Sequence, residues 1–416
     1  MKLIGNPKGM NLYPKVIKEV TPTNHKYGAD VTVSYHTDTY KPTLEGHGID
    51  AEINAFKYNL QGTILISPST DSAYNEEIKD VLETGRFSSG IYFRAFLDDI
   101  QSQVDFYRSI TGKDASYWSY GNGLRDHDDF ALQHSLVTRR SGSGQVNYDF
   151  DTRLEHSCAT LFNYNVRDND MVSALATTET MLNKAILENG WFNDFSHWHW
   201  AEFYGDKNQL EQFFNQQNAV LNGVNYVSLG SGEAVEYMWL RKLYKRGGMY
   251  QDGNDLVLIS DVRNDVELPF NAIDTTLSIE IDLIGTILEG KEISSSAEIL
   301  KVDANKYIVQ VPYSKQDGFR SVRLKETLEP NYLDLSLPII NNATEYDGTL
   351  SVTTDKPTNI VVFSIPTGGE MYQAEIVSRS NTMSNEHEVV VGDVSGKDVY
   401  IGAITSSKRS ILHKLV

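Results

Sequence analysis

The sequence of 416 residues predicts an α/β barrel followed by all-β sandwich modules. From about residue 28 to 250, segments in which apolar residues recur every second position, as in strands, alternate with segments of helical spacing. This order of elements implies parallel strands. After about residue 252 the helical period disappears, and short strand-like runs are separated by turn signals. The sequence therefore indicates an N-terminal extension over 1–27, a barrel over 28–250, a sandwich module over 251–340 and a second one over 341–416.

The elements of the barrel half follow one another along the chain. Val31 to His36 alternates as a strand does, and Ile49 to Phe56 repeats this pattern. Leu97 to Tyr107 has helical spacing, and Gly112 ends that helix. The further expected elements are strands over 115–120, 191–200 and 224–229, and helices over 171–186, over 210–221 with Asp206 as its cap, and from Ser231 onward.

The β half is expected to hold short strands only. Turn signals such as Asp347–Gly348 and Gly368–Gly369 separate them, which is typical of a sandwich. The expected strands cover 256–259, 276–283, 307–311, 321–324, 349–353, 359–365, 388–391 and 399–404.

The composition excludes several classes of partner. A net charge of −19 argues against nucleic acid or an anionic membrane as the main partner, because both need a basic surface. It is compatible with neutral or cationic sugars, and equally with solubility alone. Cys158 is the one cysteine, so no disulfide framework forms within a chain. No signal peptide or apolar run of membrane-spanning length is readable, so we expect a soluble, cytoplasmic chain or a virion or extracellular one that bypasses ordinary export.

Three segments resemble the polysaccharide deacetylase (NodB-homology) family of carbohydrate esterases. VTVSYHTDTY, residues 31–40, is similar to the family's first strand, and residues 96–124 are similar to a helix, a TG-K turn and a strand. NGWFNDFSHWHWAEFY, residues 189–204, together with SGEAVEYMWLRK, residues 231–242, is similar to the last histidine strand and the closing helix. The resemblance spans roughly residues 28–246 and implies a deacetylase-like, irregular (β/α) barrel.

The resemblance also implies a chemistry: metal-dependent hydrolysis of acetyl groups on a glycan. Asp38 matches the general base and His197 the general acid. Thr39 stands where the family has a metal-binding aspartate, and residues 85–96 hold no histidine for the H-x-x-x-H motif. The metal-binding motifs are therefore degenerate.

A different metal site would use histidines of the two strands. Residues two apart on a strand share a face, so neighbouring strands could bring together His36, Asp38, His197 and His199. Such nitrogen and oxygen ligands suit a divalent metal such as zinc. Two further interpretations stay open. His36 and His199 could be satisfied barrel histidines, or Asp38 and His197 could act without a metal.

Aromatic residues form a second candidate constellation, because indole rings stack on the apolar faces of sugars. All five tryptophans lie between Trp118 and Trp239. Trp118 is expected to lie in a groove. Together with Tyr120 and Asn122 of the following turn, it is expected to bind the substrate. For most of these rings, packing in the core is the competing interpretation.

Two functions are therefore open. One is a hydrolase of deacetylase type with a glycan substrate. The other is a catalytically inactive scaffold that uses the fold for glycan binding or assembly, for example as a homo-oligomer or a phage virion protein.

Overall fold

The computed structural model describes residues 16–37, 53–68, 72–93, 99–120, 127–139, 170–195, 209–262, 273, 275–313, 319–369 and 373–415. By their contacts, the residues divide into two compact units. One unit comprises 29–239, 267–274 and 334–416, and the other comprises 1–28, 240–266 and 275–333. Within the described ranges, no helix combines the length and the apolar character that crossing a membrane would require.

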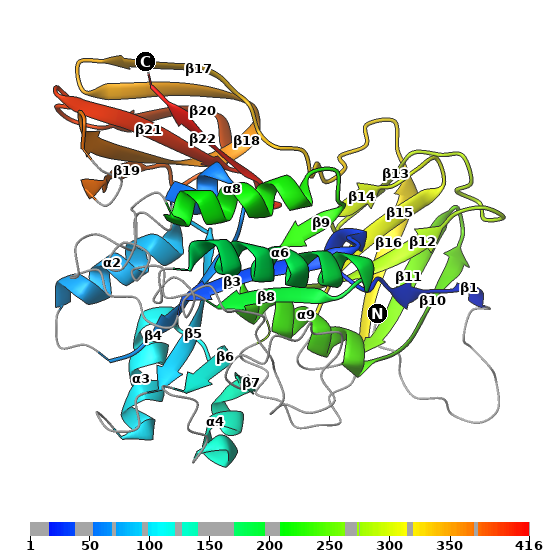
Figure 1. Cartoon of the computed structure of the whole chain (residues 1–416). Coiled ribbons are helices and arrows are strands. Elements are labelled where there is room, and N and C mark those ends of the chain that lie inside the picture. Colours follow the sequence, from blue (N-terminus) through cyan, green and yellow to red (C-terminus); the bar gives the residue numbers. More distant parts are fainter. Residues whose placement is uncertain are drawn as a thin grey trace. The chain divides into compact units, whose positions relative to one another are not determined.

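Seven parallel strands form the main sheet of the first unit (Figure 1). Their order is β7-β6-β5-β4-β3-β8, and β9 also pairs with β3. Helices connect these strands, so the α/β class predicted from the alternation of periods is confirmed. The strands are β3 (Val31–Thr37), β4 (Gly62–Ile66), β5 (Phe87–Phe93), β6 (Ala115–Tyr120), β7 (Ser135–Arg139), β8 (Trp191–Phe195) and β9 (Tyr226–Ser228).

Strand β3 lies between three neighbours. Thr32 pairs with Trp191 of β8 and with Val227 of β9. Tyr35 pairs with β8 as well, and with Gly62 of β4. A strand has two hydrogen-bonding sides, so β8 occupies one side while β9 and β4 follow each other along the other.

The sheet is curled into an incomplete barrel. Asn193 on β8 and Tyr117 on β6 lie four strand positions apart, which in a flat sheet would be about 19 Å at the usual spacing of about 4.8 Å. The Asn193 amide nevertheless donates a hydrogen bond to the Tyr117 hydroxyl at 3.4 Å. Only a strongly curved sheet brings these two side chains together.

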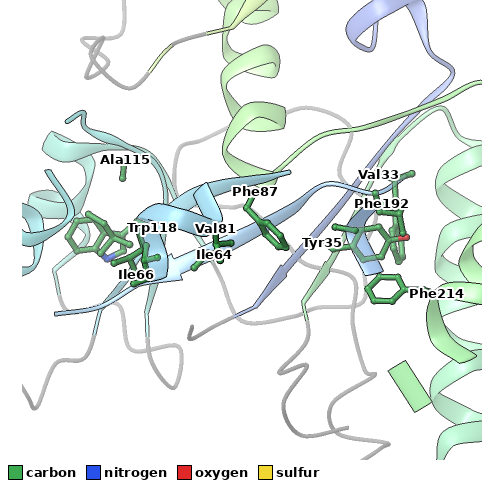
Figure 2. Packing of buried hydrophobic residues seen from close by; sticks show 14 of the residues in the cluster. Val33, Tyr35, Ile64, Ile66, Val81, Phe87, Ala115, Trp118, Phe192 and Phe214 are labelled. Carbon is green, nitrogen blue, oxygen red and sulfur yellow. The ribbon is translucent and has the colours of Figure 1, made fainter. Parts of the chain in front are cut away.

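The core lies on the outer side of this sheet, beneath the helices. Val31, Val33 and Tyr35 alternate along β3 and belong to one buried apolar cluster. The Tyr35 ring makes edge contacts with Phe192 of β8 and with Phe214, which Figure 2 shows beside it. The helices of the unit are α2 (Ser72–Glu83), α3 (Ile100–Thr111), α4 (Asp128–His134), α6 (Met171–Leu187), α8 (Gln209–Leu221) and α9 (Ser231–Leu243), of which residues 240–243 belong to the second unit.

Local sequence explains both ends of α3 and the start of α6. The Asp99 carboxylate accepts hydrogen bonds from the backbone of Gln101 and Ser102 and so caps α3. Gly112 ends α3 in the left-handed region at φ 73°, where a glycine carries no steric cost. Asp170 caps α6 through the backbone N–H of Ser173.

The strand predicted over 49–56 is wrong in its described part, because residues 53–57 are helical. The reason is that both sides of this short helix are buried. Ile53 and Phe56 pack in one cluster with Phe363, and Ala55 belongs to the core under the parallel sheet.

The C-terminal residues of the first unit form a β module in which one strand serves two layers. The first part of β18 (Thr349–Pro366) pairs with β17 and β20, and its second part pairs with β19 and β21. Leu350 from the first part packs with Ile360 and Ile401 from the second, so the layers enclose a core as the predicted sandwich requires. The other strands are β17 (Ile340–Tyr346), β19 (Glu375–Arg379), β20 (Ser384–Val390), β21 (Lys397–Ile404) and β22 (Ser410–Lys414).

The second unit consists of two antiparallel sheets, which agrees with the sandwich predicted after residue 252. The N-terminal segment contributes β1 and β2, pairings that the sequence did not indicate. One sheet contains β1 (Val16–Glu19), β10 (Tyr244–Asp252), β11 (Asp255–Val262), β16 (Phe319–Glu326) and β13 (Ile293–Ser295). The other contains β14 (Ile299–Lys301), β15 (Lys306–Pro312), β12 (Thr276–Asp282) and β2 (Thr21–Pro22), and a 3₁₀ turn, η1, covers Lys26–Gly28.

Candidate functional site

The carboxyl ends of the parallel strands define the candidate site. In α/β barrels, functional groups gather at the edge where these ends meet. The described residues reach this edge at Thr37, Pro68, Phe93, Tyr120 and Phe195. Four of the predicted site residues follow directly in sequence and lie outside the described residues: Asp38, Asn122, His197 and His199.

The pairing of β3 with β8 sets the geometry at this edge. The two strands are parallel, and His36 and Phe195 are Cα partners at the end of the described register. Two residues before the end of that register on β3, Ser34 Oγ accepts a hydrogen bond of 2.8 Å from the Trp191 indole on β8, so these two side chains share the inner face. The first strand and the late tryptophan–histidine strand are therefore neighbours, which is the condition on which the predicted cluster of histidines and Asp38 depends.

Polar side chains fill the inner face toward the amino ends of the strands. The Ser231 backbone N–H, at the start of α9, donates to Thr63 Oγ1 at 2.6 Å, and its hydroxyl donates to Asn193 Oδ1 at 2.9 Å. Further along the same helix, Glu236 accepts a hydrogen bond from Ser116 of β6 and is 4% exposed. The first turns of α9 therefore lie inside the curve of the sheet.

Close approach of the backbone explains the glycine before α9. A Cβ atom at Gly230 would lie 2.0 Å from Ser88 Oγ, so no other residue fits there without displacing β5. Sequence reasoning missed Thr63, Ser116 and Glu236 as a group. The small residues of LGSGEA were the available signal, since small residues allow a helix to approach a sheet this closely.

The predicted aromatic site differs from the structure. The Trp118 side chain has no exposed area, and Tyr120 is 4% exposed. Phe93 packs against both rings, with centroids 6.1 Å and 5.7 Å away. Trp118 therefore lies in the core and not in a groove, because the apolar residues of β5 cover a ring that the sequence placed beside an open turn.

A buried polar pair lies on the outer face of the same two strands. Tyr35 and Asp194 are Cα partners, and both are buried. Burial raises the pKa of Tyr35 well above its usual value, and the nearby Asp194 carboxylate raises it further. The Tyr35 phenol therefore stays protonated at neutral pH. The sequence did not single out Asp194, because an aspartate between Asn193 and Phe195 looks like an ordinary strand position.

The described residues do not fit a metal. Among them, no three histidine, cysteine, aspartate or glutamate side chains are grouped closely enough to hold an ion. The predicted ligand set of His36, Asp38, His197 and His199 has only its His36 backbone within the described residues.

Comparisons with known proteins give only distant similarities. No family model matches the chain, and no curated protein does. A solved structure of a candidate polysaccharide deacetylase from Mycobacterium smegmatis is 12% identical with a TM-score of 0.41, covering 57% of this chain and 100% of its own. The Bc1960 peptidoglycan N-acetylglucosamine deacetylase is 14% identical with a TM-score of 0.30, covering 50% of this chain and 89% of its own.

A third solved structure is the catalytic domain of a peptidoglycan N-acetylglucosamine deacetylase from Eubacterium rectale. It is 14% identical with a TM-score of 0.31, covering 51% of this chain and 94% of its own. Because all three TM-scores are low, the fold class follows from the strand order and from the curl of the sheet, and not from these similarities.

Proposed function

We propose that the chain is a glycan-directed hydrolase of deacetylase type, with Asp38 as general base and His197 as general acid. The supporting observation is the register of β3 and β8. His36 and Phe195 are partners on parallel strands, and Asp38 and His197 each come two residues later in the sequence. Equal offsets from a paired position favour a common location for the carboxylate and the imidazole at the carboxyl edge.

The two groups suit hydrolysis of an acetyl group. The Asp38 carboxylate takes a proton from water, and the oxygen of that water forms a bond to the acetyl carbonyl carbon. The C–N or C–O bond to the sugar then breaks, and His197 gives its proton to the departing amine or hydroxyl. The products are acetate and a sugar with a free amine or hydroxyl.

The second candidate function is a non-catalytic glycan-binding scaffold. One observation favours it. Strand β5 and its neighbouring residues over 85–96 hold no histidine where the resembled family has its H-x-x-x-H motif.

Acetate release from acetylated chitooligomers and acetylated xylan, with and without added zinc or cobalt, separates the two candidates. The hydrolase requires release that Asp38→Asn abolishes. The matched control is Asp30→Asn, which changes an exposed aspartate at the amino end of the same strand and should leave the rate unchanged. Oligomer binding without release under every condition would support the scaffold instead.

A further inference from the structure

The C-terminal β module presents an exposed, mainly polar sheet face. Strands β17, β18 and β20 lie side by side there (Figure 1). Directly opposed residues on antiparallel strands share a face, so the register defines three rows across the strands. This open sheet face consists of the rows Tyr346–Thr349–Val390, Thr344–Ser351–Glu388 and Asn342–Thr353–Glu386.

The alternation of the strands shows that this face points to solvent. Leu350, Val352 and Val389 occupy the intervening positions and are buried in the core of the module. On the open sheet face, Tyr346 is 84% exposed and Val390 is 73% exposed. The face is therefore accessible, and a large aromatic ring stands at one corner of it.

The charge of the open sheet face is entirely negative. Glu386 and Glu388 are both exposed and lie two residues apart on β20, a spacing of about 7 Å along a strand. In the part of the chain that the structure describes, neither carboxylate forms an ion pair. The remaining polar groups of the face are hydroxyls, one amide and the phenol, and no lysine or arginine stands on it.

This chemistry discriminates between ligand classes. A protein partner would need an apolar centre, and Val390 is the one aliphatic side chain of the face. A nucleic acid is repelled by the two carboxylates. A sugar ring can stack on Tyr346 while its hydroxyls bond with Thr344, Ser351 or Asn342. The unpaired carboxylates select sugars that carry a positive charge.

We propose that the open sheet face binds polysaccharide chains bearing free amines, with Tyr346 stacking on a sugar ring and Glu386 and Glu388 pairing with ammonium groups. The choice of an amine-bearing glycan rests on the proposed function, because N-deacetylation of a glycan leaves free amines on the product. The binding itself requires neither Asp38 nor His197.

Calorimetric titration of the full chain tests the inference with three probes of matched length: glucosamine oligomers, N-acetylglucosamine oligomers and oligolysine. Glucosamine oligomers should bind at least about tenfold more tightly than the acetylated ones. Tyr346→Ala and Glu388→Gln should each weaken that binding by about threefold to tenfold. Tyr346→Phe, which keeps the ring, and Glu280→Gln, which removes an exposed strand carboxylate elsewhere, should bind as the parent does.

Two results would overturn the inference. One is that oligolysine binds as tightly as glucosamine oligomers, since this would show unspecific attraction of cations. The other is unchanged glucosamine binding in the Tyr346→Ala/Glu388→Gln double variant. Acetate release measured on the same samples reports on the proposed function separately. Loss of release in Asp38→Asn with retained glucosamine binding would show that the two activities are independent.

Discussion

Trp191 on β8 and Ser34 on β3 are joined by a buried hydrogen bond of 2.8 Å, from the indole Nε1 to the serine Oγ. Both side chains are fully buried. The bond crosses between the two strands whose following residues include Asp38 and His197. It thereby fixes both the register of the strands and the face on which alternate residues lie.

Trp191→Phe should lower the free energy of unfolding by about 1–3 kcal/mol, because it removes a buried donor and leaves Ser34 Oγ without it. Chemical denaturation of the full chain measures this. Ser34→Ala should cost a similar amount. The Trp191→Phe/Ser34→Ala double variant should cost less than the sum of the two, and strict additivity would show that the bond contributes nothing.

Arg86 should be intolerant of replacement. It has no exposed area, and its guanidinium donates to the carbonyl oxygens of Leu60 and Lys408 and, at 3.2 Å, of Ala55. Burial lowers the pKa of Arg86 to about 9, so the group is still charged at neutral pH. Arg86→Met should cost about 1–3 kcal/mol of unfolding free energy for each carbonyl left without a donor.

Arg379 provides the matched control for Arg86. It also connects the C-terminal module to the α/β residues of the same unit, through Asp80 and Glu83 at 2.8 Å each, but at a partly exposed position. Water screens such pairs, so Arg379→Met should cost less than about 1 kcal/mol in the same denaturation experiment. Equal losses for the two arginine variants would contradict the role given to burial.

Phe56→Ala should destabilise the first unit by about 3–5 kcal/mol, the usual cost of removing a buried phenylalanine. Its ring is fully buried and makes an edge contact with Phe363 of β18 at 5.9 Å between centroids. A Cβ atom at Gly402 would lie 2.7 Å from this ring. Gly402→Ala should therefore be costly in the parent chain and much less so in the Phe56→Ala variant, and equal costs in both would refute the contact.

The free energy of unfolding should fall at alkaline pH because of the buried Tyr107. Burial raises the pKa of Tyr107 to about 12. The Tyr107 hydroxyl is hydrogen-bonded to Ser89 Oγ at 2.8 Å. Above about pH 10 the unfolded chain loses this proton and the folded chain keeps it, so folding stability falls between about pH 10 and 12. Denaturation midpoints across this range measure the slope, which should be shallower in Tyr107→Phe. The same slope in both proteins would exclude Tyr107 as its source.

Periodicity was sufficient for much of the fold because the two faces of a strand differ in polarity, even where both are buried, as on β3 with Ser34 on one face and Val33 and Tyr35 on the other. Val31 to His36 alternates, since its odd-numbered residues face the helices. The helix over 53–57 escaped this reasoning because Ile53 and Phe56 face β18, far along the chain. No local pattern reveals a contact of that range, and tertiary packing overrode the strand-like alternation.

The candidate site was predictable in part. The two strands themselves followed from their alternating polar residues, whereas their pairing was only a condition of the predicted cluster, which the register of β3 and β8 meets. The burial of Trp118 did not follow, because a tryptophan beside a turn signal gives no information on the side chains that cover it. The inward course of α9 depends on Gly230 passing close to Ser88, which is a contact between distant segments.

Strand β18 runs without interruption from Thr349 to Pro366. Its first part carries three residues of the open sheet face, and its second part contributes Val361 and Phe363 to the cluster around Phe56. Carbohydrate-recognising modules on flexible tethers sample many orientations around their enzymes. Here a single extended backbone replaces the tether, so a polymer captured on the face would be held at a fixed distance and angle from the α/β residues that surround Phe56.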